Sequence, residues 1–399
     1  MTVQDTHDTT SASVQRAAGV APARDRSVDA LRGFALLGVI LVNVPFFAYP
    51  IGALGGVERP VDLWAFGALM TLAIGKFFLI FSFLFGFGFA TSIASDQAKG
   101  RRSGPRFARR LTGLFVFGAL HAVFFFIGDI LMLYALLGVL LWFARNFAPR
   151  TLLVLAVLAY LLAVFAQAAA FTATGTDPEG TARAAAAYLG GFLDAADFRL
   201  REDIWLGQPF ILIFNGPAAL AMFLAGLALA KMRLFPGVRG RRARWRLGWT
   251  LLLIGLGASA ASLAWVGPLY VAPPGGPSGA EFFAAMARSA AAPLLSAGYG
   301  LLLLAAADRT PESVWVRILA IAGQMTLTGY LLHSVILAFV FGGWGLGWYA
   351  QVSAATCIAV GLGVYLSLVT VFAVWKRRFR YGPDEWLLRS WVDLRAARM

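Results

Sequence analysis

The chain has 399 residues, of which 59% are hydrophobic and only 14% are charged, and its mean hydropathy is +0.73. Soluble domains are nearer to half apolar and about a quarter charged, so this composition excludes a soluble protein and predicts a polytopic membrane protein. The net charge of +14 does not indicate nucleic acid, because the basic residues stand in short loops between apolar runs, where they set topology. The single cysteine, Cys357, excludes an internal disulfide and a cysteine metal site.

The N-terminal segment, residues 1–26, is polar and is predicted to be a disordered cytoplasmic tail. No short signal peptide with a cleavage site precedes the first long apolar run, so we expect that run to be a retained anchor. A membrane-spanning helix needs about 20 apolar residues, and by this length residues 27–376 form an all-α transmembrane bundle of ten predicted spans. The spans lie at about 30–49, 70–95, 108–127, 129–147, 151–171, 209–230, 247–267, 286–307, 316–341 and 350–375.

Three segments do not fit a simple succession of spans. Residues 60–95 are too long for one span, so residues 60–75 are expected to form a separate interfacial helix. The join at 172–208 is polar and long enough for a small helical excursion outside the membrane. The tail 377–399 carries Trp386 and Trp391 among basic residues, which predicts an amphipathic helix on the inner surface.

The basic residues predict the orientation of the bundle. With a cytoplasmic N-terminus, 28 of the 34 lysines and arginines fall in inner segments and 5 in outer segments, and Lys76 is left over. Inner loops of membrane proteins carry the excess of positive charge. The distribution therefore predicts that both termini are cytoplasmic and that the number of spans is even.

Polar residues in the first predicted span form one row. Arg32, Leu36, Val39 and Asn43 are spaced so that they share one face of a helix, and Asp29 lies close to Arg32. Arg32 could hold a phosphate-bearing ligand from the cytoplasm, and Asn43 could line a passage. An equally weighted interpretation makes Asp29 and Arg32 a topology-setting pair and Asn43 the donor of an interhelical hydrogen bond.

Lys76 opens the second span, near its predicted outer end. A lysine at such a position usually extends its ammonium group to water. Lys76 could instead pair with Asp129, which is also predicted at the outer end of its span.

The segment 118–138 contains the strongest candidate site. His121 lies inside an apolar run, and Asp129 follows in a short break before the next run. Ionisable groups this deep in a membrane are costly and point to function by default. An imidazole can act as a general base near neutral pH, and Gly118, one turn away, leaves room beside it. The alternative is a histidine that only binds a neighbouring helix; Tyr134 lies about 140° around the helix from Asp129 and is the weaker candidate.

Two later spans contribute further polar candidates. Asn215 precedes Gly216 and Pro217, where a kink that frees backbone carbonyls is expected. In the ninth span, Gln324 and His333 could face a cavity, whereas the threonines between them are expected to bind neighbouring helices.

Five motifs stand out along the chain, namely VDALRGFALLGVILVN (28–43), KFFLIFSFLFG (76–86), LHAVFFFIGDILMLYALLG (120–138), GQMTLTGYLLHS (323–334) and YGPDEWLLRS (381–390). Together they resemble the motifs of the YeiB family of bacterial membrane proteins, which is also defined by a domain of unknown function, number 418. They come in the family's order and span nearly the whole chain. At Gly329 and His333 the chain departs from the family pattern, so the resemblance assigns no role to His333.

The YeiB family resembles, more distantly, the transmembrane acyltransferases, which move an acyl group from cytosolic acyl-CoA to a hydroxyl or amine on the far side of the membrane. The resemblance implies an enzyme of the bacterial inner membrane with acetyl-CoA as co-substrate, no permanently bound cofactor, and a glycan or other small molecule as acceptor. It would use His121 as base, Asp129 to orient it or the acceptor, and Arg32 for the donor phosphates.

Two other classes of protein remain open. A transporter of a small or lipid-like solute would use the same polar residues as a proton relay and the Asn215 break as a discontinuous helix. A scaffold would have only membrane lipid as partner and would leave His121 and Asp129 without a purpose. The sequence predicts no metal site and gives no indication of the oligomeric state.

Overall fold

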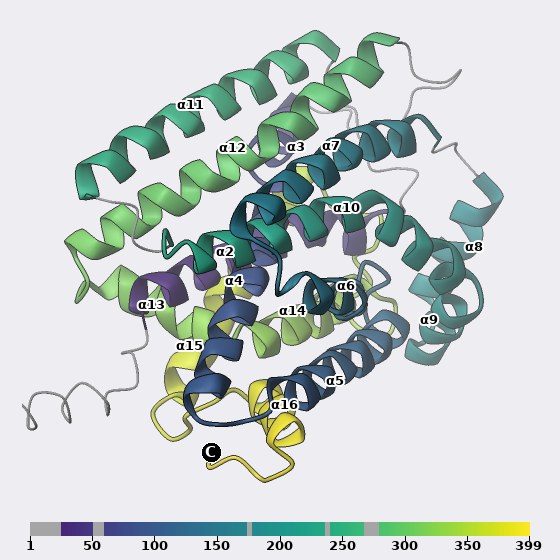
Figure 1. Ribbon diagram of the computed structural model, residues 1–399. Coiled ribbons are helices and arrows are strands. Elements are labelled where there is room, and N and C mark those ends of the chain that lie inside the picture. Colours follow the sequence, from purple (N-terminus) through teal and green to yellow (C-terminus); the bar gives the residue numbers. More distant parts are fainter. Residues whose placement is uncertain (1–24, 51–59, 174–177, 236–239, 267–278) are drawn as a thin grey trace, which may run out of the picture.

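A computed structural model describes residues 25–50, 60–173, 178–235, 240–266 and 279–399 (Figure 1). Every regular element in these residues is helical, which confirms the all-α prediction. The predicted tail 1–26 lies almost entirely outside the described residues. The helices are α2 (Arg26–Ala48), α3 (Pro60–Leu72), α4 (Lys76–Ala98), α5 (Ser103–Phe124), α6 (Leu131–Ala144), α7 (Pro149–Ala173), α8 (Pro178–Leu189), α9 (Phe192–Phe198), the π-helix η2 (Arg199–Asp203), α10 (Ile204–Lys231), α11 (Arg241–Val266), α12 (Gly279–Arg309), α13 (Val314–Gln324), α14 (Thr326–Phe341), α15 (Ala354–Trp375) and α16 (Pro383–Asp393).

The described residues contain eight helices that are long and apolar enough to cross a membrane. The bent pair α13 and α14 provides a ninth, and the short apolar helix α6 occupies the position of the fourth predicted span. Large apolar side chains of α7 and α11, such as Leu161 and Leu253, are about 60% exposed, as expected for surfaces that face lipid. The chain is a multi-pass membrane protein.

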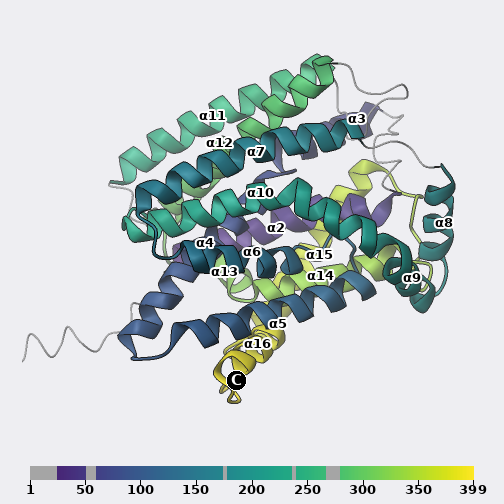
Figure 2. The same ribbon diagram turned by 45° about the vertical axis from the view of Figure 1, so that its right-hand side comes forward.

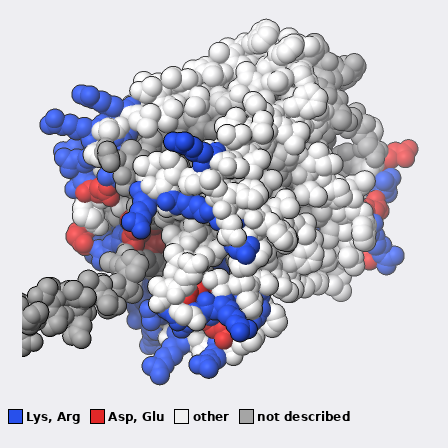
Figure 3. Space-filling model, viewed as in Figure 1, with Lys and Arg blue, Asp and Glu red and all other residues white. Residues whose placement is uncertain are grey.

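The helix ends predicted to be cytoplasmic meet at one face, which we call the basic face. Arg26 pairs with Glu312, Arg244 pairs with Asp308, and Lys231 donates to a carbonyl in the α6–α7 turn. Figure 3 shows lysines and arginines gathered along the left and lower edges, separated from the opposite end by a broad uncharged band. The predicted outer segment 172–208 folds into α8, α9 and η2 at that opposite end (Figure 1).

Helix α2 lies inside the bundle and contacts α4, α12, α13, α14 and α15. The largest apolar cluster surrounds it, with fully buried Leu36, Ile40 and Val44 at its centre. In both ribbon views α7, α11 and α12 cover one side of the bundle, whereas α5 and α16 lie along the opposite side (Figures 1 and 2). This arrangement puts α5, α6 and α14 next to one another below α2 in these views.

The predicted ninth span, 316–341, is not one helix. It breaks at Met325 into α13 and α14, which meet at 82°. Helix α13 is pressed against α2, because a Cβ at Gly323 would lie only 1.7 Å from the carbonyl oxygen of Asp29. The close approach holds α13 along α2, and α14 turns sharply away from α13 at the break.

The C-terminal tail forms a helix, as its amphipathic pattern predicts, and that helix caps the start of α14 at the break. Glu385 of α16 accepts hydrogen bonds from the backbone nitrogens of Leu327 and Thr328, at 2.7 and 3.1 Å, and from the Thr328 hydroxyl at 2.7 Å. These are donors that the first turn of α14 cannot satisfy within the helix. Burial raises the pKa of the Glu385 carboxyl, and these hydrogen bonds act against that shift.

Two further predictions about helix shape have different outcomes. Residues 60–75 do form an element of their own, because α3 ends at Leu72 and α4 begins at Lys76. The kink expected at Asn215 falls inside one continuous helix, because α10 runs through Pro209 and Pro217, so the discontinuous helix of the transporter alternative is not found there.

Candidate functional site

His121 and Asp129 form a buried pair. Nδ1 of His121 lies 2.8 Å from Oδ2 of Asp129, and the two residues are only 2% and 0% exposed. Because an ionised carboxylate can only accept hydrogen bonds, the Nδ1–H group donates to it. The other ring nitrogen, Nε2, is buried and has no hydrogen-bond partner among the described residues. Nε2 is therefore the ring nitrogen that is left open to a group from outside the protein.

The local sequence explains why the two side chains meet. Helix α5 ends at Phe124 and α6 begins at Leu131, so a short turn brings Asp129 back toward His121. Oδ1 of Asp129 accepts the backbone N–H of Met132, 2.9 Å away, at the start of α6. A Cβ at Gly118 would lie 2.5 Å from this Oδ1, so the room that Gly118 leaves is taken up by the carboxylate.

Tyr330 connects this pair to α14. Its hydroxyl donates to Oδ2 of Asp129 over 3.4 Å, a long hydrogen bond, and accepts the backbone N–H of Ile130 over 3.2 Å. The centres of the Tyr330 and His121 rings are 5.0 Å apart. Tyr330 thus holds the loop between α5 and α6 against the broken ninth span.

The second buried histidine, His333, has partners on both ring nitrogens. Nδ2 of Asn43 lies 3.1 Å from its Nε2, and the carbonyl oxygen of Gly329 lies 3.2 Å from its Nδ1. An amide N–H₂ group can only donate, so Nε2 accepts and Nδ1 carries the hydrogen. Of the two roles weighed for Asn43, the structure contains the interhelical hydrogen bond. His333 and Asn43 therefore join α14 to α2.

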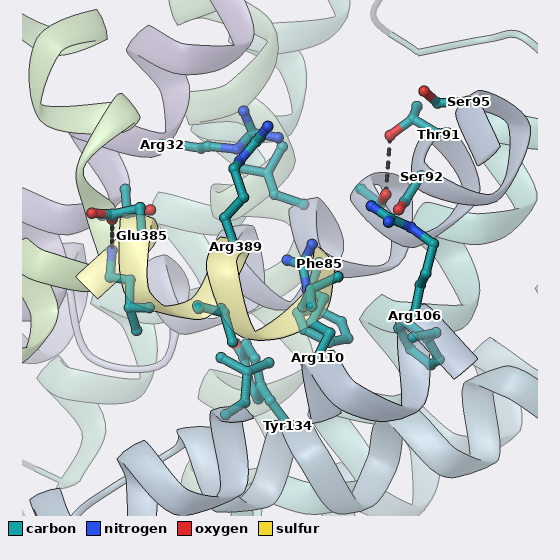
Figure 4. A pocket seen from close by; sticks show the side chains of 18 of the residues that line it. Arg32, Phe85, Thr91, Ser92, Ser95, Arg106, Arg110, Tyr134, Glu385 and Arg389 are labelled. Carbon is teal, nitrogen blue, oxygen red and sulfur yellow. Dashed lines mark hydrogen bonds between the residues drawn. The ribbon is translucent and has the colours of Figure 1, made fainter. Parts of the chain in front are cut away.

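A cavity of about 600 Å³ runs from the basic face toward the histidine pair. It extends from the exposed side chains of Lys99 and Arg101 to Tyr330 and Ile130. Tyr330 contacts Asp129, and Ile130 is the next residue after Asp129 in the chain. Helices α2, α4, α5, α6, α13, α14 and α16 contribute to its wall, and Figure 4 shows several of the lining side chains. This volume lies in the range of ligand-binding pockets.

Three of the residues predicted from sequence line this cavity, namely Arg32, Tyr134 and Gln324. Asp29 is buried, and its Oδ1 accepts a hydrogen bond from Nη1 of Arg32 over 2.8 Å. The hydroxyl of Tyr134 is 2.7 Å from the Ser82 hydroxyl. Tyr134 and Asp129 therefore belong to two neighbouring environments, as their spacing around the helix indicates.

Lys76 and Asn215 lie apart from the site. The Lys76 side chain does not reach water, because the residue is 1% exposed and its Nζ donates to the carbonyl oxygen of Met70 at 2.9 Å. Its predicted pairing with Asp129 is also wrong, since Asp129 binds His121, Tyr330 and a backbone nitrogen instead. Asn215 is half-buried on α10 and does not line the cavity.

Sequence reasoning missed three cavity residues, Arg110, Arg389 and Glu385. A signal for Arg110 was present, because it stands 11 residues before His121 and 8 before Gly118 and therefore shares their helix face. Arg389 and Glu385 gave no such signal, because they lie in the tail and reach the cavity only when α16 packs against α5 and α14.

Comparisons with known proteins place this arrangement in a family. The chain is 31% identical to the uncharacterized protein YxaH of Bacillus subtilis over 91% of this chain and 92% of that protein. It is 29% identical to the uncharacterized protein YeiB of Escherichia coli over 94% and 97% of the two chains. Residues 229–395 match the family model described as protein of unknown function (DUF418). The chain belongs to the YeiB family. No solved structure matches it.

The YeiB-family motifs meet at the site described above. The motif 120–138 contains the histidine pair, the motif 323–334 contains the break at Met325, and the motif 381–390 is the start of α16 that caps α14. Segments that are far apart in the YeiB-family sequence thus build one buried pair and one cavity.

Proposed function

We propose that this protein is a transmembrane acyltransferase of the bacterial inner membrane, which takes an acetyl or other acyl group from cytosolic acyl-CoA and delivers it to a hydroxyl or amine, such as that of a glycan, on the far side. The cavity from the basic face is the donor entrance. The histidine pair, which lies behind Tyr330 and Ile130 at the inner end of this cavity, is the reaction centre.

The proposed step is a direct acyl transfer. Nε2 of His121 removes the proton from the acceptor hydroxyl or amine as the acceptor atom bonds to the acyl carbonyl carbon. The bond from this carbon to sulfur then breaks, and the imidazolium returns its proton to the departing thiolate. The products are the acylated acceptor and free CoA thiol. Asp129 is a positioning residue, which keeps the hydrogen on Nδ1 and stabilises the imidazolium that forms.

A second, much smaller cavity favours entry of the acceptor from the other side. It measures about 30 Å³ and is lined mainly by aromatic side chains, among them Phe47, Phe126 and Tyr349. The Phe126 ring centre is 6.1 Å from that of His121, and Phe126 stacks on Phe47 at 4.6 Å. A sugar needs more room than this, so acceptor entry requires these two rings to move apart.

The observation that carries the proposal is the free Nε2 of His121. A buried polar group without a partner costs roughly 1–3 kcal/mol, and His333 shows that the same bundle can satisfy both nitrogens of a histidine. His121 does not itself line the cavity, but the Tyr330 ring that does is centred 5.0 Å from its ring, so a nitrogen left free here is arranged for a group that arrives from outside the protein.

The test uses detergent-purified protein and the variant His121→Ala. We would measure acetyl-CoA binding by calorimetry and the slow hydrolysis of acetyl-CoA, with water as acceptor, by thiol release. We expect both proteins to bind acetyl-CoA and the variant to lose at least about 100-fold in turnover, the contribution typical of a general base. Full turnover in a folded His121→Ala protein would contradict the assignment.

A transporter of a small or lipid-like solute is the second candidate, and one observation favours it. Broken helices mark the substrate sites of many transporters, and the break at Met325, between α13 and α14, adjoins the cavity. If folded protein neither binds nor hydrolyses acetyl-CoA, proton-coupled uptake into vesicles becomes the assay of choice.

A further inference from the structure

We propose that Arg32, Arg110 and Arg389 form a binding site for the phosphate groups of a ligand that enters the cavity from the basic face. We call these three residues the arginine cluster. The inference deepens the proposed function, on which it rests for the identity of the ligand as a nucleotide-type donor.

Arg110 is the strongest part of the observation. Its Nε is buried and has no hydrogen-bond partner, and no described carboxylate lies within ion-pair distance of its guanidinium group. Among the described residues its partner is the Phe85 ring, whose centre lies 5.7 Å from the guanidinium carbon. Arg110 as a whole is half-buried, and a partly desolvated cation without an acidic partner is stabilised by a counterion.

The other two arginines approach Arg110 from different helices. Figure 4 shows the side chains of Arg32 from α2 and Arg389 from α16 pointing toward each other, with Arg110 from α5 directed into the same space. All three arginines line the same cavity. Like charges gathered in this way repel unless an anion lies among them.

The carboxylates of the cavity wall do not supply that anion. Asp96 and Asp393 both pair with Arg106, and Glu385 is occupied by the first turn of α14. Asp29 does not line the cavity, but its carboxylate accepts a hydrogen bond from Arg32. Among the described residues of the wall, Arg110 and Arg389 are thus left without an acidic partner.

Arginine suits phosphate better than a single negative charge. Its planar fork donates two parallel hydrogen bonds to phosphate oxygens, and three forks around one space match a ligand with several charges, such as a diphosphate ester. The cavity continues from the cluster to Tyr330 and Ile130, so a ligand held here by its phosphates can extend a slender arm toward His121.

The experiment measures binding of CoA, ADP, inorganic pyrophosphate and phosphate-free pantetheine to detergent-purified protein by calorimetry. The variants are Arg110→Gln, Arg110→Lys, which keeps the charge if the glutamine variant does not fold, and the exposed Arg389→Gln. Arg317→Gln is the matched control, because it removes an exposed positive charge of the basic face outside the cavity.

We expect the parent to bind CoA, ADP and pyrophosphate but pantetheine only weakly, with affinity that falls as salt rises. Each change at Arg110 or Arg389 should weaken CoA and ADP on the order of tenfold, the value of a charge-assisted hydrogen bond, and Arg317→Gln should not. Parental affinity in folded Arg110→Lys and Arg389→Gln proteins would overturn the inference, as would a parent that binds none of the phosphate compounds.

A phospholipid headgroup offers the same phosphate chemistry, and nanodiscs distinguish the two sources. Competition against ADP by phosphatidylglycerol, but not by phosphatidylcholine, would support the phosphate site and assign it to an anionic lipid. The inference and the proposed function also fail separately. If turnover depends on His121 but not on the arginines, the proposed function stands and the phosphate site is wrong. If ADP binding depends on the arginines but acetyl-CoA is not turned over, the phosphate site stands and the proposed function is wrong.

Discussion

At the scale of single residues, hydrogen bonding separates the two buried histidines. His333 uses one nitrogen for Asn43 and the other for the Gly329 carbonyl, so its ring is a cross-link between helices. His121 is fixed through one nitrogen only, by Asp129, and its Nε2 has no partner among the described residues. Burial is nearly the same for both, at 0% and 2% exposure, so burial alone does not identify the reactive ring.

Gly118 provides a test of how closely Asp129 must be placed. A Cβ at this position would lie 2.5 Å from Oδ1 of Asp129 and 2.6 Å from the backbone nitrogen of Met132. Gly118→Ala should therefore push the carboxylate away from His121 and lower acetyl-CoA turnover about 100-fold, as expected when a reacting group is misplaced by an ångström.

The control is Gly257→Ala on α11, where the added Cβ meets nothing within 4 Å. Thermal unfolding in detergent, followed for both variants, distinguishes a local displacement from a loss of fold. Parental turnover in Gly118→Ala would mean that the contact between His121 and Asp129 does not support the reaction.

At the scale of helices, the sequence predicted most spans but not their interruption. The apolar length that locates a span is a local property, so ten runs could be read directly. The break at Met325 depends on partners that are distant in sequence, namely Asp29 against Gly323 and Glu385 on the first turn of α14. The residues of the candidate site also fall into those that local sequence predicts and those that depend on distant partners. His121 and Asp129 are eight residues apart and were found, whereas Arg389 required the placement of α16.

The contacts of Glu385 predict that this residue holds α16 against α14. Glu385→Ala removes the acceptor for the backbone nitrogens of Leu327 and Thr328 and for the Thr328 hydroxyl, at a cost of about 1–2 kcal/mol, as for a lost helix cap. We expect α16 to detach more often, so that limited proteolysis removes the C-terminal residues faster than in the parent. CoA affinity should fall as well, because α16 carries Arg389.

The control for this experiment is Glu312→Ala. Glu312 is an exposed carboxylate of the same face, and its ion pair with Arg26 is largely solvated, so its loss should change little. Cleavage of Glu385→Ala at the parental rate would show that other contacts dock the helix, such as the 2.8 Å hydrogen bond from the Trp391 indole to the Arg109 carbonyl.

At the scale of the whole molecule, the proposed transfer depends on orientation. The cavity opens at the basic face, and acyl-CoA is a cytosolic compound in the proposed reaction, so the basic face must be cytoplasmic. The excess of basic residues in the predicted inner segments agrees with this direction. The cavity and the arginine cluster would have no access to the donor in an inverted protein.

Cysteine labelling can determine the orientation directly. The native Cys357 is 1% exposed, so the parent should react poorly with a membrane-impermeant maleimide and can act as the background. Arg183→Cys on α8 should be labelled in intact cells, because α8 lies at the end opposite the basic face, whereas Arg395→Cys should be labelled only after the cells are permeabilised. The reverse pattern would exclude a cytosolic donor for this cavity. The ten-span topology puts an odd number of crossings between Arg183 and Arg395, so the two sites lie on opposite sides of the membrane. Labelling of both sites in intact cells would mean an even number of crossings and would contradict that topology.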